Sequence, residues 1–488
     1  MDILMVTPEL LPFAKTGGLA DVTEALSSAL ADMGEKVSAV LPCYRGIEDR
    51  FETESTGIIL NIPILDGDHW IDKKGEILKT VLDSRVDVYL IKMDEYFDRE
   101  NLYAEGDRDY EDNCARFTFF CSSVIELLKK MKKRPDVINC HDWQAALVPI
   151  YLKTVFHQDE ELKDLPVVTT IHNLGYQGIF WHWDMKLIGV PWERYNPAEL
   201  EYYGKLNLLK GAIVYSDLLT TVSKGYAEEI QTPENGYGLD GVVRDRKDDL
   251  AGILNGINYD IWDPATDPLL PKNYSMKDMS GKAVCKAQLQ KEMGLPQDPH
   301  VPLVASISRL VEQKGFDIVA YMMDRILKSG VQYVLLGTGE KKYRDFFTDM
   351  ARKNPDKMAV VIGHEEGLAH RIEAGADIFL MPSRYEPCGL NQMISMKYGT
   401  VPVVRATGGL DDTVIPWDET TDEGVGFKFK EYSGEALYSA IELALSAYRD
   451  ATGWKKLVEN CMKEDHSWTA SAKEYLAVYE QALAKRKK

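Results

Sequence analysis

The sequence predicts an α/β protein made of two domains, each with a parallel sheet. Its 488 residues exceed what one hydrophobic core usually supports, so two domains of about 200 residues each are expected. Short apolar runs alternate with segments of helical period, which is typical of parallel α/β layers. Two glycine-paired turns, Lys15-Thr16-Gly17-Gly18 and Thr407-Gly408-Gly409, each precede a predicted helix. Glycine pairs let backbone N–H groups approach an anion, so two such turns predict an anion held in a cleft between domains.

The first predicted domain spans residues 1–250. An apolar run at 3–7 predicts a buried strand. Apolar residues then recur at steps of three and four, which predicts a helix that ends at Gly34. Further strands are predicted at 37–41, 86–91, 136–139, 167–171 and 218–222.

The second predicted domain spans residues 251–466. Its strands are predicted at 301–306, 333–336, 359–362, 377–381 and 401–404, and the proline-rich segment 263–271 is predicted to be irregular. From Trp468 the pattern is helical again. We expect the terminal helix, 467–488, to cross back and complete the first domain.

Composition restricts the class of partner and the compartment. A net charge of −20 argues against nucleic acid and against an acidic membrane surface. No run of eighteen apolar residues occurs, and no basic region precedes the first apolar stretch, so neither a membrane span nor a secretory signal is predicted. The seven cysteines form an odd set without Cys-x-x-Cys spacing, which favours the reducing cytoplasm.

Three cations lie in settings that suit an anionic ligand. Lys15 stands before the first glycine pair, where its ammonium and a helix N-terminus both favour a phosphate. Arg309 and Lys314 follow a predicted strand, and both could reach one diphosphate. The alternatives are an ordinary turn in the first case and two exposed charges in the second. The first loop is not a Walker A loop, which needs Gly-Lys-Ser/Thr after a longer glycine spacing.

Glu386 follows the predicted strand at 377–381 and precedes Pro387-Cys388-Gly389-Leu390. A carboxylate here could bind a sugar hydroxyl or stabilise positive charge that develops on the sugar. The alternative is capping, with Pro387 at the first position of a helix. No partner base for Cys388 is apparent, so a packing role is expected for it.

Two histidine segments follow strands of the first domain. His141-Asp142-Trp143 and His172-Asn173 stand where ligands gather in open α/β sheets. Structural roles are the alternative: a satisfied core histidine, and Trp143 as part of a domain wall. There is no His-Glu-x-x-His pair and no acidic cluster, so no metal is implied.

Read together, these segments resemble the glycogen and starch synthases of bacteria and plastids. The match runs through KTGGLADV (15–22), DYEDNCARF (109–117), HDWQ (141–144), IHNLGYQG (171–178), TVSKGYAEEI (221–230), GILNGI (252–257), SRLVEQKG (308–315), SRYEPCGLNQ (383–392) and TGGLDDTV (407–414). The resemblance implies the GT-B fold, with two Rossmann-like, doubly wound parallel-sheet domains that face a deep cleft. It also implies transfer of glucose from a nucleotide sugar, with ADP-glucose expected, to the non-reducing 4-hydroxyl of an α-1,4-glucan with retention of configuration. No cofactor is implied.

The resemblance also implies roles for individual residues. The catalytic set is His172, Arg309, Lys314 and Glu386. The implied substrate-binding set is Lys15, Gly17, Gly18, Asp21, Tyr96, Asp142, Trp143, Asn255, His364, Cys388, Gly389, Leu390, Thr407, Gly408 and Gly409. Within it, Tyr96 and Asp21 are expected nearer the acceptor. Arg309 and Lys314, assisted by Lys15, are expected to stabilise the departing diphosphate. Glu386 is expected to orient the sugar and stabilise its charge; attack by Glu386 as a nucleophile is the alternative, which a trapped glucosyl adduct would support.

Two positions depart from the family pattern. Ala212 follows Lys210-Gly211 where relatives commonly have a second glycine, a change expected to tighten one turn. His364 stands where relatives often have a tyrosine that stacks on adenine.

Three other functions are weighed against this one. A catalytically silent glucan-binding or regulatory protein is disfavoured by the intact lysine, arginine and glutamate positions. A phosphorylase-type enzyme would need a Schiff-base lysine and pyridoxal phosphate. A nicotinamide dehydrogenase is disfavoured because no Gly-x-Gly-x-x-Gly follows the first strand.

Overall fold

The computed structural model describes residues 1–67, 69–106, 108–131 and 134–486. The chain forms two compact units. Unit 1 consists of Met1–Val222, Ala227–Ile253 and the segment that begins at Trp468, and unit 2 consists of Ser223–Tyr226 and Leu254–Ser467. Residues 487 and 488, the end of the predicted terminal helix, lie outside the described residues. The domain limits at 250/251 and 466/467 stay a prediction.

Unit 1 is built around a mainly parallel sheet. In the described residues its strand order is β14-β13-β9-β8-β1-β2-β5-β4-β3. The bounds are β1 (Asp2–Val6), β2 (Lys36–Pro42), β3 (Glu54–Asp66), β4 (His69–Leu82), β5 (Val86–Lys92), β8 (Val137–His141), β9 (Val167–Ile171), β13 (Leu218–Thr221) and β14 (Leu250–Gly252). The strands from β14 to β5 pair in parallel. β1 is buried along its whole length, as its unbroken apolar run predicts for a parallel strand.

One edge of this sheet carries a hairpin that the sequence pattern did not predict. β3 pairs antiparallel with β4, and β4 pairs antiparallel with β5. Along β3, buried Leu60, Ile62 and Ile64 alternate with exposed residues. This alternation is typical of an antiparallel strand with one face on the core and the other in water. A sheet that is parallel at its centre therefore ends in an antiparallel edge.

Along the chain, the helices of unit 1 connect its strands, except that α18 follows the last segment of unit 2. The bounds are α1 (Gly18–Asp32), α2 (Ile47–Arg50), α3 (Asp94–Phe97), α4 (Asn113–Lys130), α5 (Leu147–Lys153), α6 (Asp184–Ile188), α7 (Leu208–Tyr215), α9 (Asp240–Asp245) and α18 (Trp468–Arg486), with α8 (Lys224–Glu229) beginning in unit 2. A small antiparallel sheet adds β10 (Ile179–Trp181), β12 (Lys205–Asn207) and β11 (Glu201–Tyr202), and β6 (Ala104–Glu105) pairs with β7 (Arg108–Asp109). Lys210-Gly211-Ala212 lies inside α7, so the expectation of a tightened turn there is wrong. Close packing explains the glycine at position 211, since a Cβ there would lie 2.5 Å from Leu200 Cδ2 and 2.6 Å from Ile150 Cδ1.

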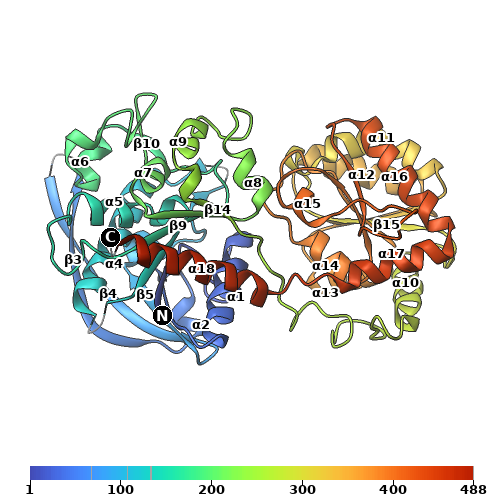
Figure 1. Cartoon of the computed structure of the whole chain (residues 1–488), viewed down its shortest axis with the longest axis horizontal. Helices are drawn as coiled ribbons and strands as arrows, with labels where there is room; N and C mark the ends of the chain where they lie inside the picture. The colour runs from blue at the N-terminus through green and yellow to red at the C-terminus, as the bar shows by residue number, and fades with distance from the viewer. Residues whose placement is uncertain (68, 107, 132–133, 487–488) are drawn as a thin grey trace. The chain divides into compact units, whose positions relative to one another are not determined.

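The terminal helix α18 packs on unit 1, beside α1 and against β8 and β9 (Figure 1). Its inner face carries the buried Tyr475 and Tyr479. The Tyr479 hydroxyl donates to Asn139 Oδ1 at 2.8 Å, and Asn139 Nδ2 donates to Thr170 Oγ1 at 2.8 Å. Because Asn139 lies in β8 and Thr170 in β9, this bond ties the end of the chain to the centre of the first sheet.

Unit 2 contains a parallel sheet with the order β17-β16-β15-β18-β19-β20 in the described residues. The strands are β15 (Leu303–Ile307), β16 (Gln332–Gly337), β17 (Met358–Ile362), β18 (Ile378–Met381), β19 (Val401–Arg405) and β20 (Phe427–Phe429). Its helices are α10 (Ser280–Glu292), α11 (Phe316–Lys328), α12 (Lys341–Lys353), α13 (Glu366–Gly375), α14 (Asn391–Lys397), α15 (Gly408–Thr413), α16 (Gly434–Arg449) and α17 (Ala451–Lys463). A core of buried Leu289, Leu303, Val334, Ile372 and Phe379 packs α10 and α13 against the sheet. The parallel order brings the segments after β15, β18 and β19 to one edge of this sheet.

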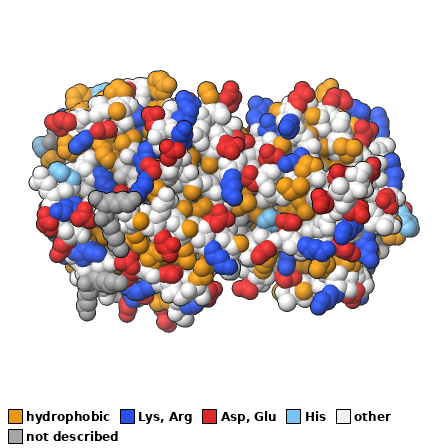
Figure 2. All heavy atoms as spheres, viewed as in Figure 1, with side chains coloured by type: hydrophobic (Ala, Val, Ile, Leu, Met, Phe, Trp, Pro, Cys, Tyr) orange, Lys and Arg blue, Asp and Glu red, His pale blue; other side chains and the backbone are white. Residues whose placement is uncertain are grey.

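Surface charges of both signs are interspersed over the face drawn in Figure 2. Among the described helices, none combines the length and apolar character that a membrane span requires.

We predict that Tyr479→Phe destabilises the protein by about 1–3 kcal/mol, because the substitution leaves the buried Asn139 Oδ1 without its donor. Urea unfolding of the full chain, followed by tryptophan fluorescence, measures this change. The matched control is Lys473→Ala, an exposed position on the same helix. Equal midpoints for Tyr479→Phe and the control would contradict a structural role for this bond.

Candidate active site

In unit 1, the predicted anion loop lies between β1 and α1. The helix begins at Gly18, with Gly17 as its N-cap, so the predicted helix opening is confirmed. A Cβ built on Gly17 or on Gly18 would have no atom within 4 Å. The described chain therefore has no steric need for glycine at these positions. Open space beside the backbone is what a ligand that approaches the loop requires.

The loop is held by Glu9, a residue that the motifs did not single out. Thr16 N and Thr16 Oγ1 each donate to the Glu9 carboxylate at 2.6 Å, and Gly17 N donates to it at 3.3 Å. Tyr103 adds a hydroxyl donor at 2.8 Å. Glu9 is buried, so its negative charge is balanced by these donors rather than by water. A sequence signal did exist: an acid three residues after the end of the first buried strand.

Lys15 and Asp21 form an ion pair with each other at 2.7 Å. Their side chains are 47% and 37% exposed. An exposed pair of this kind contributes little to stability, so the Lys15 ammonium can exchange this partner for a ligand anion at small cost. The two predicted roles, diphosphate for Lys15 and acceptor for Asp21, thus fall on side chains in direct contact.

Two predicted segments of unit 1 meet because β8 and β9 are neighbours. His141 Nδ1 lies 2.9 Å from His172 Nε2, and Asp142 Oδ1 accepts the backbone N–H of His172 at 2.8 Å. Burial lowers the pKa of His172 to about 3 and that of His141 well below its usual value, so both rings are neutral near pH 7. Burial raises the pKa of Asp142 to about 7. Asp142 also has a φ of 54°, a left-handed backbone that a non-glycine residue adopts at a cost.

Trp143 and Tyr96 are core residues of unit 1. The Trp143 ring lies 4.9 Å from Phe117, and a Cβ on Gly178 would come within 2.5 Å of it. The Tyr96 ring lies 5.8 Å from Phe119 and is 4% exposed. Each aromatic ring therefore packs against the chain itself.

In unit 2, Lys314 and Glu386 form an ion pair at 2.5 Å, with side chains only 18% and 8% exposed. Ser383 Oγ donates to the same carboxylate oxygen of Glu386 at 2.9 Å. Lys314 comes from the turn after β15, and Ser383 and Glu386 come from the loop after β18. The pair thus joins two neighbouring strand ends.

The helix after Glu386 begins later than capping would require. α14 starts at Asn391, with Leu390 as its N-cap, so Pro387 is not at the first helical position. The capping interpretation of this segment is therefore wrong. Burial raises the pKa of the Cys388 thiol to about 12, which keeps it protonated and agrees with a packing role.

Glycine is needed at the second pair, Gly408 and Gly409, for a different physical reason than at the first pair. α15 begins at Gly408, with Thr407 as its N-cap, as predicted. A Cβ on Gly408 would lie 2.1 Å from the carbonyl oxygen of Glu386, and one on Gly409 would lie 2.1 Å from that of Cys388. These glycines let the turn after β19 pack directly on the backbone beside the ion pair.

Three further predicted residues lie around this edge of unit 2. Arg309 is exposed and contacts Gln313 Oε1 at 3.4 Å. His364 is exposed in the segment that follows β17. Asn255 is buried, and its Oδ1 has no partner in the described residues. A buried amide oxygen without a partner calls for an explanation, and a ligand donor would supply one.

Each unit therefore carries a polar cluster at the carboxyl edge of its own sheet. The cluster of unit 1 holds Lys15, Asp142 and His172, and that of unit 2 holds Arg309, Lys314 and Glu386. In the described residues, no group of three or more histidine, cysteine, aspartate or glutamate side chains could hold a metal ion.

Comparisons with known proteins cover the whole chain. The family described as starch synthase catalytic domain matches residues 2–245, and glycosyl transferases group 1 matches residues 290–460. The chain is 48% identical over 486 residues to the glycogen synthase of Geotalea uraniireducens (100% of each chain) and 45% identical to that of Koribacter versatilis (99% of this chain and 98% of the relative). Among solved structures, the catalytic domain of starch synthase IV from Arabidopsis thaliana, bound to ADP and acarbose, has a TM-score of 0.89 and 34% identity with 99% coverage of both chains.

A sucrose-phosphate synthase from Thermosynechococcus elongatus, 17% identical with a TM-score of 0.61 and 99% coverage of both chains, shares the fold. The predicted two-domain GT-B fold and the predicted family are both confirmed. This chain belongs to the glycogen and starch synthase family and is a glycosyltransferase.

Proposed function

We propose that the enzyme transfers glucose from ADP-glucose to the non-reducing 4-hydroxyl of an α-1,4-glucan, with retention of configuration. The observation that carries this proposal is the partly buried Lys314–Glu386 pair at the carboxyl edge of unit 2, with the exposed Arg309 nearby in the sequence. Full-length similarity to glycogen synthases, and to a starch synthase whose structure contains ADP, supports the choice of donor and acceptor. The seven free, buried cysteines suit a reaction in the reducing cytoplasm.

The donor diphosphate is the most highly charged part of the reaction. As its bond to C1 of glucose breaks, negative charge grows on the leaving oxygen, and fixed cations lower the barrier most when they lie at that oxygen. Arg309 and Lys314 supply such cations from unit 2, and Lys15 from unit 1 assists. The net charge of −20 makes these local cations essential, since the field of the whole protein repels the donor.

Glu386 acts as an orienting and charge-stabilising group rather than as a nucleophile. Lys314 and Ser383 both donate to its Oε2 oxygen, which lowers the nucleophilicity of that oxygen. The proposed step is therefore a displacement on one face. The C1–O bond to the diphosphate breaks, the bond from C1 to the acceptor 4-oxygen forms, and the hydroxyl proton passes to the departing ADP. Retention follows because both oxygens use the same face.

His172 takes part as a neutral group. With its pKa lowered to about 3, the ring does not carry a positive charge at neutral pH, so it cannot repel the positive charge that develops on the sugar. Its backbone N–H donates to Asp142, and its ring Nε2 lies 2.9 Å from His141 Nδ1, so both its backbone and its ring are held in place. Hydrogen bonding to the reacting glucose is the role that this arrangement supports.

An exposed aromatic surface in unit 1 suits the glucan acceptor. Three tryptophans occur within twelve residues, at 181, 183 and 192, and their side chains are 64%, 44% and 41% exposed. Neighbouring ring centroids lie 6.3 Å apart for Trp181 and Trp183 and 5.5 Å apart for Trp183 and Trp192. Large apolar rings left in water mark interaction sites, and the flat faces of glucose rings stack on such rings.

The experiment that tests the proposed function is release of ADP from ADP-glucose in the presence of glycogen, compared with release of UDP from UDP-glucose. We expect a higher kcat/KM with ADP-glucose and elongation of the glucan by α-1,4 bonds. No nucleotide release with either donor would favour a catalytically silent protein. A higher kcat/KM with UDP-glucose would overturn the proposed donor.

We predict that Lys314→Ala lowers kcat by about 10²–10³-fold, because a cation at the leaving diphosphate is lost. Steady-state kinetics with ADP-glucose and glycogen measure this. The matched control is Lys341→Ala, which removes an exposed, ion-paired lysine elsewhere in unit 2 and leaves kcat within about twofold. If Lys314 served only to neutralise Glu386, the double variant Lys314→Ala/Glu386→Gln would recover activity, and that outcome would contradict the proposed role.

We predict that Trp181→Ala and Trp183→Ala each raise KM for glycogen by about fivefold, with KM for ADP-glucose unchanged, because each loses a stacking surface. Kinetics at varied glycogen and saturating donor measure the effect. Trp70→Ala is the matched control, since Trp70 is 54% exposed on β4 outside this surface. An equal rise in KM for the control would show that the aromatic surface has no special role.

A further inference from the structure

Unit 2 contains a cavity of about 560 Å³ at the amino ends of its strands. This is the opposite edge of the sheet from Arg309, Lys314 and Glu386, because Pro299 and Asp377 in the cavity wall directly precede the β15 and β18 regions. Helices α10 and α17 supply most of the wall. The volume lies within the range of about 300–1,000 Å³ that is typical of small-molecule sites.

The walls of the cavity are largely apolar. They include Met276, Met279, Ala287, Trp454, Val458 and Met462. Methionine side chains adapt their shape to a ligand, and Trp454 offers an aromatic surface. Such walls favour a ligand with an apolar body.

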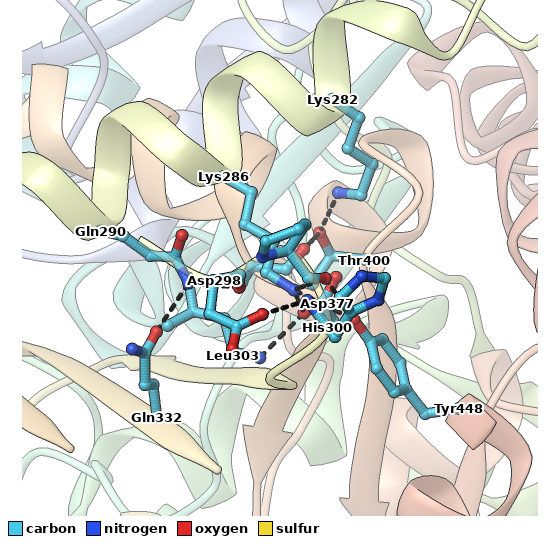
Figure 3. A network of polar contacts seen from close by, with 12 residues as sticks. Lys282, Lys286, Gln290, Asp298, His300, Leu303, Gln332, Asp377, Thr400 and Tyr448 are labelled. Atoms are coloured by element: carbon cyan, nitrogen blue, oxygen red, sulfur yellow. Dashed lines mark hydrogen bonds and ion pairs between the residues drawn. The ribbon is translucent and has the colours of Figure 1, made fainter. Parts of the chain in front are cut away.

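The floor of the cavity is formed by two lysines of α10, Lys282 and Lys286, whose ammonium groups belong to the polar network drawn in Figure 3. Lys286 Nζ contacts Asp377 Oδ2 at 2.7 Å, the Tyr448 hydroxyl at 3.0 Å and the Pro299 carbonyl at 3.0 Å. Lys282 Nζ donates to Thr400 Oγ1 at 2.9 Å and to the carbonyls of residues 398 and 374 at 3.0 and 3.2 Å. Only Asp377 among these partners is a carboxylate.

The charges of the cavity do not cancel. Lys286 is paired with the Asp377 carboxylate, whereas the partners of Lys282 are neutral oxygens, which leaves one positive charge on the floor without a paired carboxylate. Burial raises the pKa of nearby Glu373 well above its usual value, which disfavours its charged form, and its buried Oε2 has no hydrogen-bond partner in the described residues. At the rim, Lys455 and Glu459 have opposite signs and offset each other. Burial also lowers the pKa of Lys282 to about 8, because the buried ammonium loses its hydration.

We propose that this cavity binds a small organic anion that carries one negative charge on an apolar, aromatic body. The anionic group lies against the Lys282 and Lys286 end of the cavity, and the body packs between the methionines and Trp454. A single negative charge on the ligand balances the one positive charge of the floor, whereas a polyphosphate would leave excess negative charge in an apolar space. The site is separate from the proposed donor site, so the two ligands bind together rather than in competition.

The probe is 8-anilinonaphthalene-1-sulfonate, which has an aromatic body and one sulfonate. Titrated into the full chain at saturating ADP, it should show a saturable rise in fluorescence from one site, with an affinity that ADP does not change. Ala287→Phe fills the cavity and should weaken this binding by tenfold or more. Ala477→Phe, at an exposed alanine of α18 in unit 1, is the matched control and should leave binding unchanged.

A second variant tests the charge without filling the space. Lys282→Met keeps the length of the side chain and should weaken sulfonate binding about tenfold, while the neutral analogue N-phenyl-1-naphthylamine binds as it does to the unaltered chain. Displacement of the sulfonate by ADP would overturn the proposal. The proposal would also be overturned if Ala287→Phe bound the sulfonate as tightly as the unaltered chain does. The same holds if Lys282→Met weakened binding of the charged and the neutral probe equally.

Discussion

The site in unit 2 depends on the ion pair between Lys314 and Glu386 and on the backbone that packs around it. Lys314 follows β15, Glu386 follows β18, and the Thr407–Gly409 turn after β19 lies against the carbonyls of Glu386 and Cys388. Three strand ends are thereby fixed relative to one carboxylate. Because both charges are mostly buried, removal of either one leaves the other uncompensated, which costs far more than loss of an exposed pair. This pair thus fixes the position of the ammonium that we propose stabilises the donor phosphate.

The two glycine pairs show where sequence reasoning succeeds and where it stops. Both open helices, as their composition predicts, since glycine and a following apolar period are local signals. The physical reason for glycine differs between the two pairs, and it depends on parts of the chain that are distant in sequence. Gly17 and Gly18 face open space, whereas Gly408 and Gly409 are required by a backbone more than fifteen residues away in the chain. No pattern within the TGG segments distinguishes these cases.

The same limit explains the residues that the motifs missed. The buried parallel strands were predictable because each is a short run rich in apolar or β-branched residues, and the ends of those strands pointed to Lys314, Glu386 and His172, whose roles stay a prediction. Glu9 was missed because its role comes from the loop that folds over it, through donors at Thr16 and Tyr103. The contact between His141 and His172 requires β8 and β9 to be neighbours, which only the sheet order determines. The β3–β4 hairpin was missed because its alternating period is weaker than a continuous run.

The two clusters differ in charge in a way that matches the proposed reactants. In unit 1 the histidines are neutral near pH 7, burial raises the pKa of Asp142 to about 7, and Lys15 is paired with Asp21, so none of these groups adds an unpaired positive charge. In unit 2, Arg309 adds a positive charge to the balanced Lys314–Glu386 pair. A glucan is neutral and a nucleoside diphosphate is strongly anionic. The extra cation of unit 2 suits the proposed anionic donor, and the neutral histidines of unit 1 suit a glucose ring on which positive charge develops. Reversing these charges would place uncompensated cations against the sugar, where positive charge must develop, and would slow the reaction.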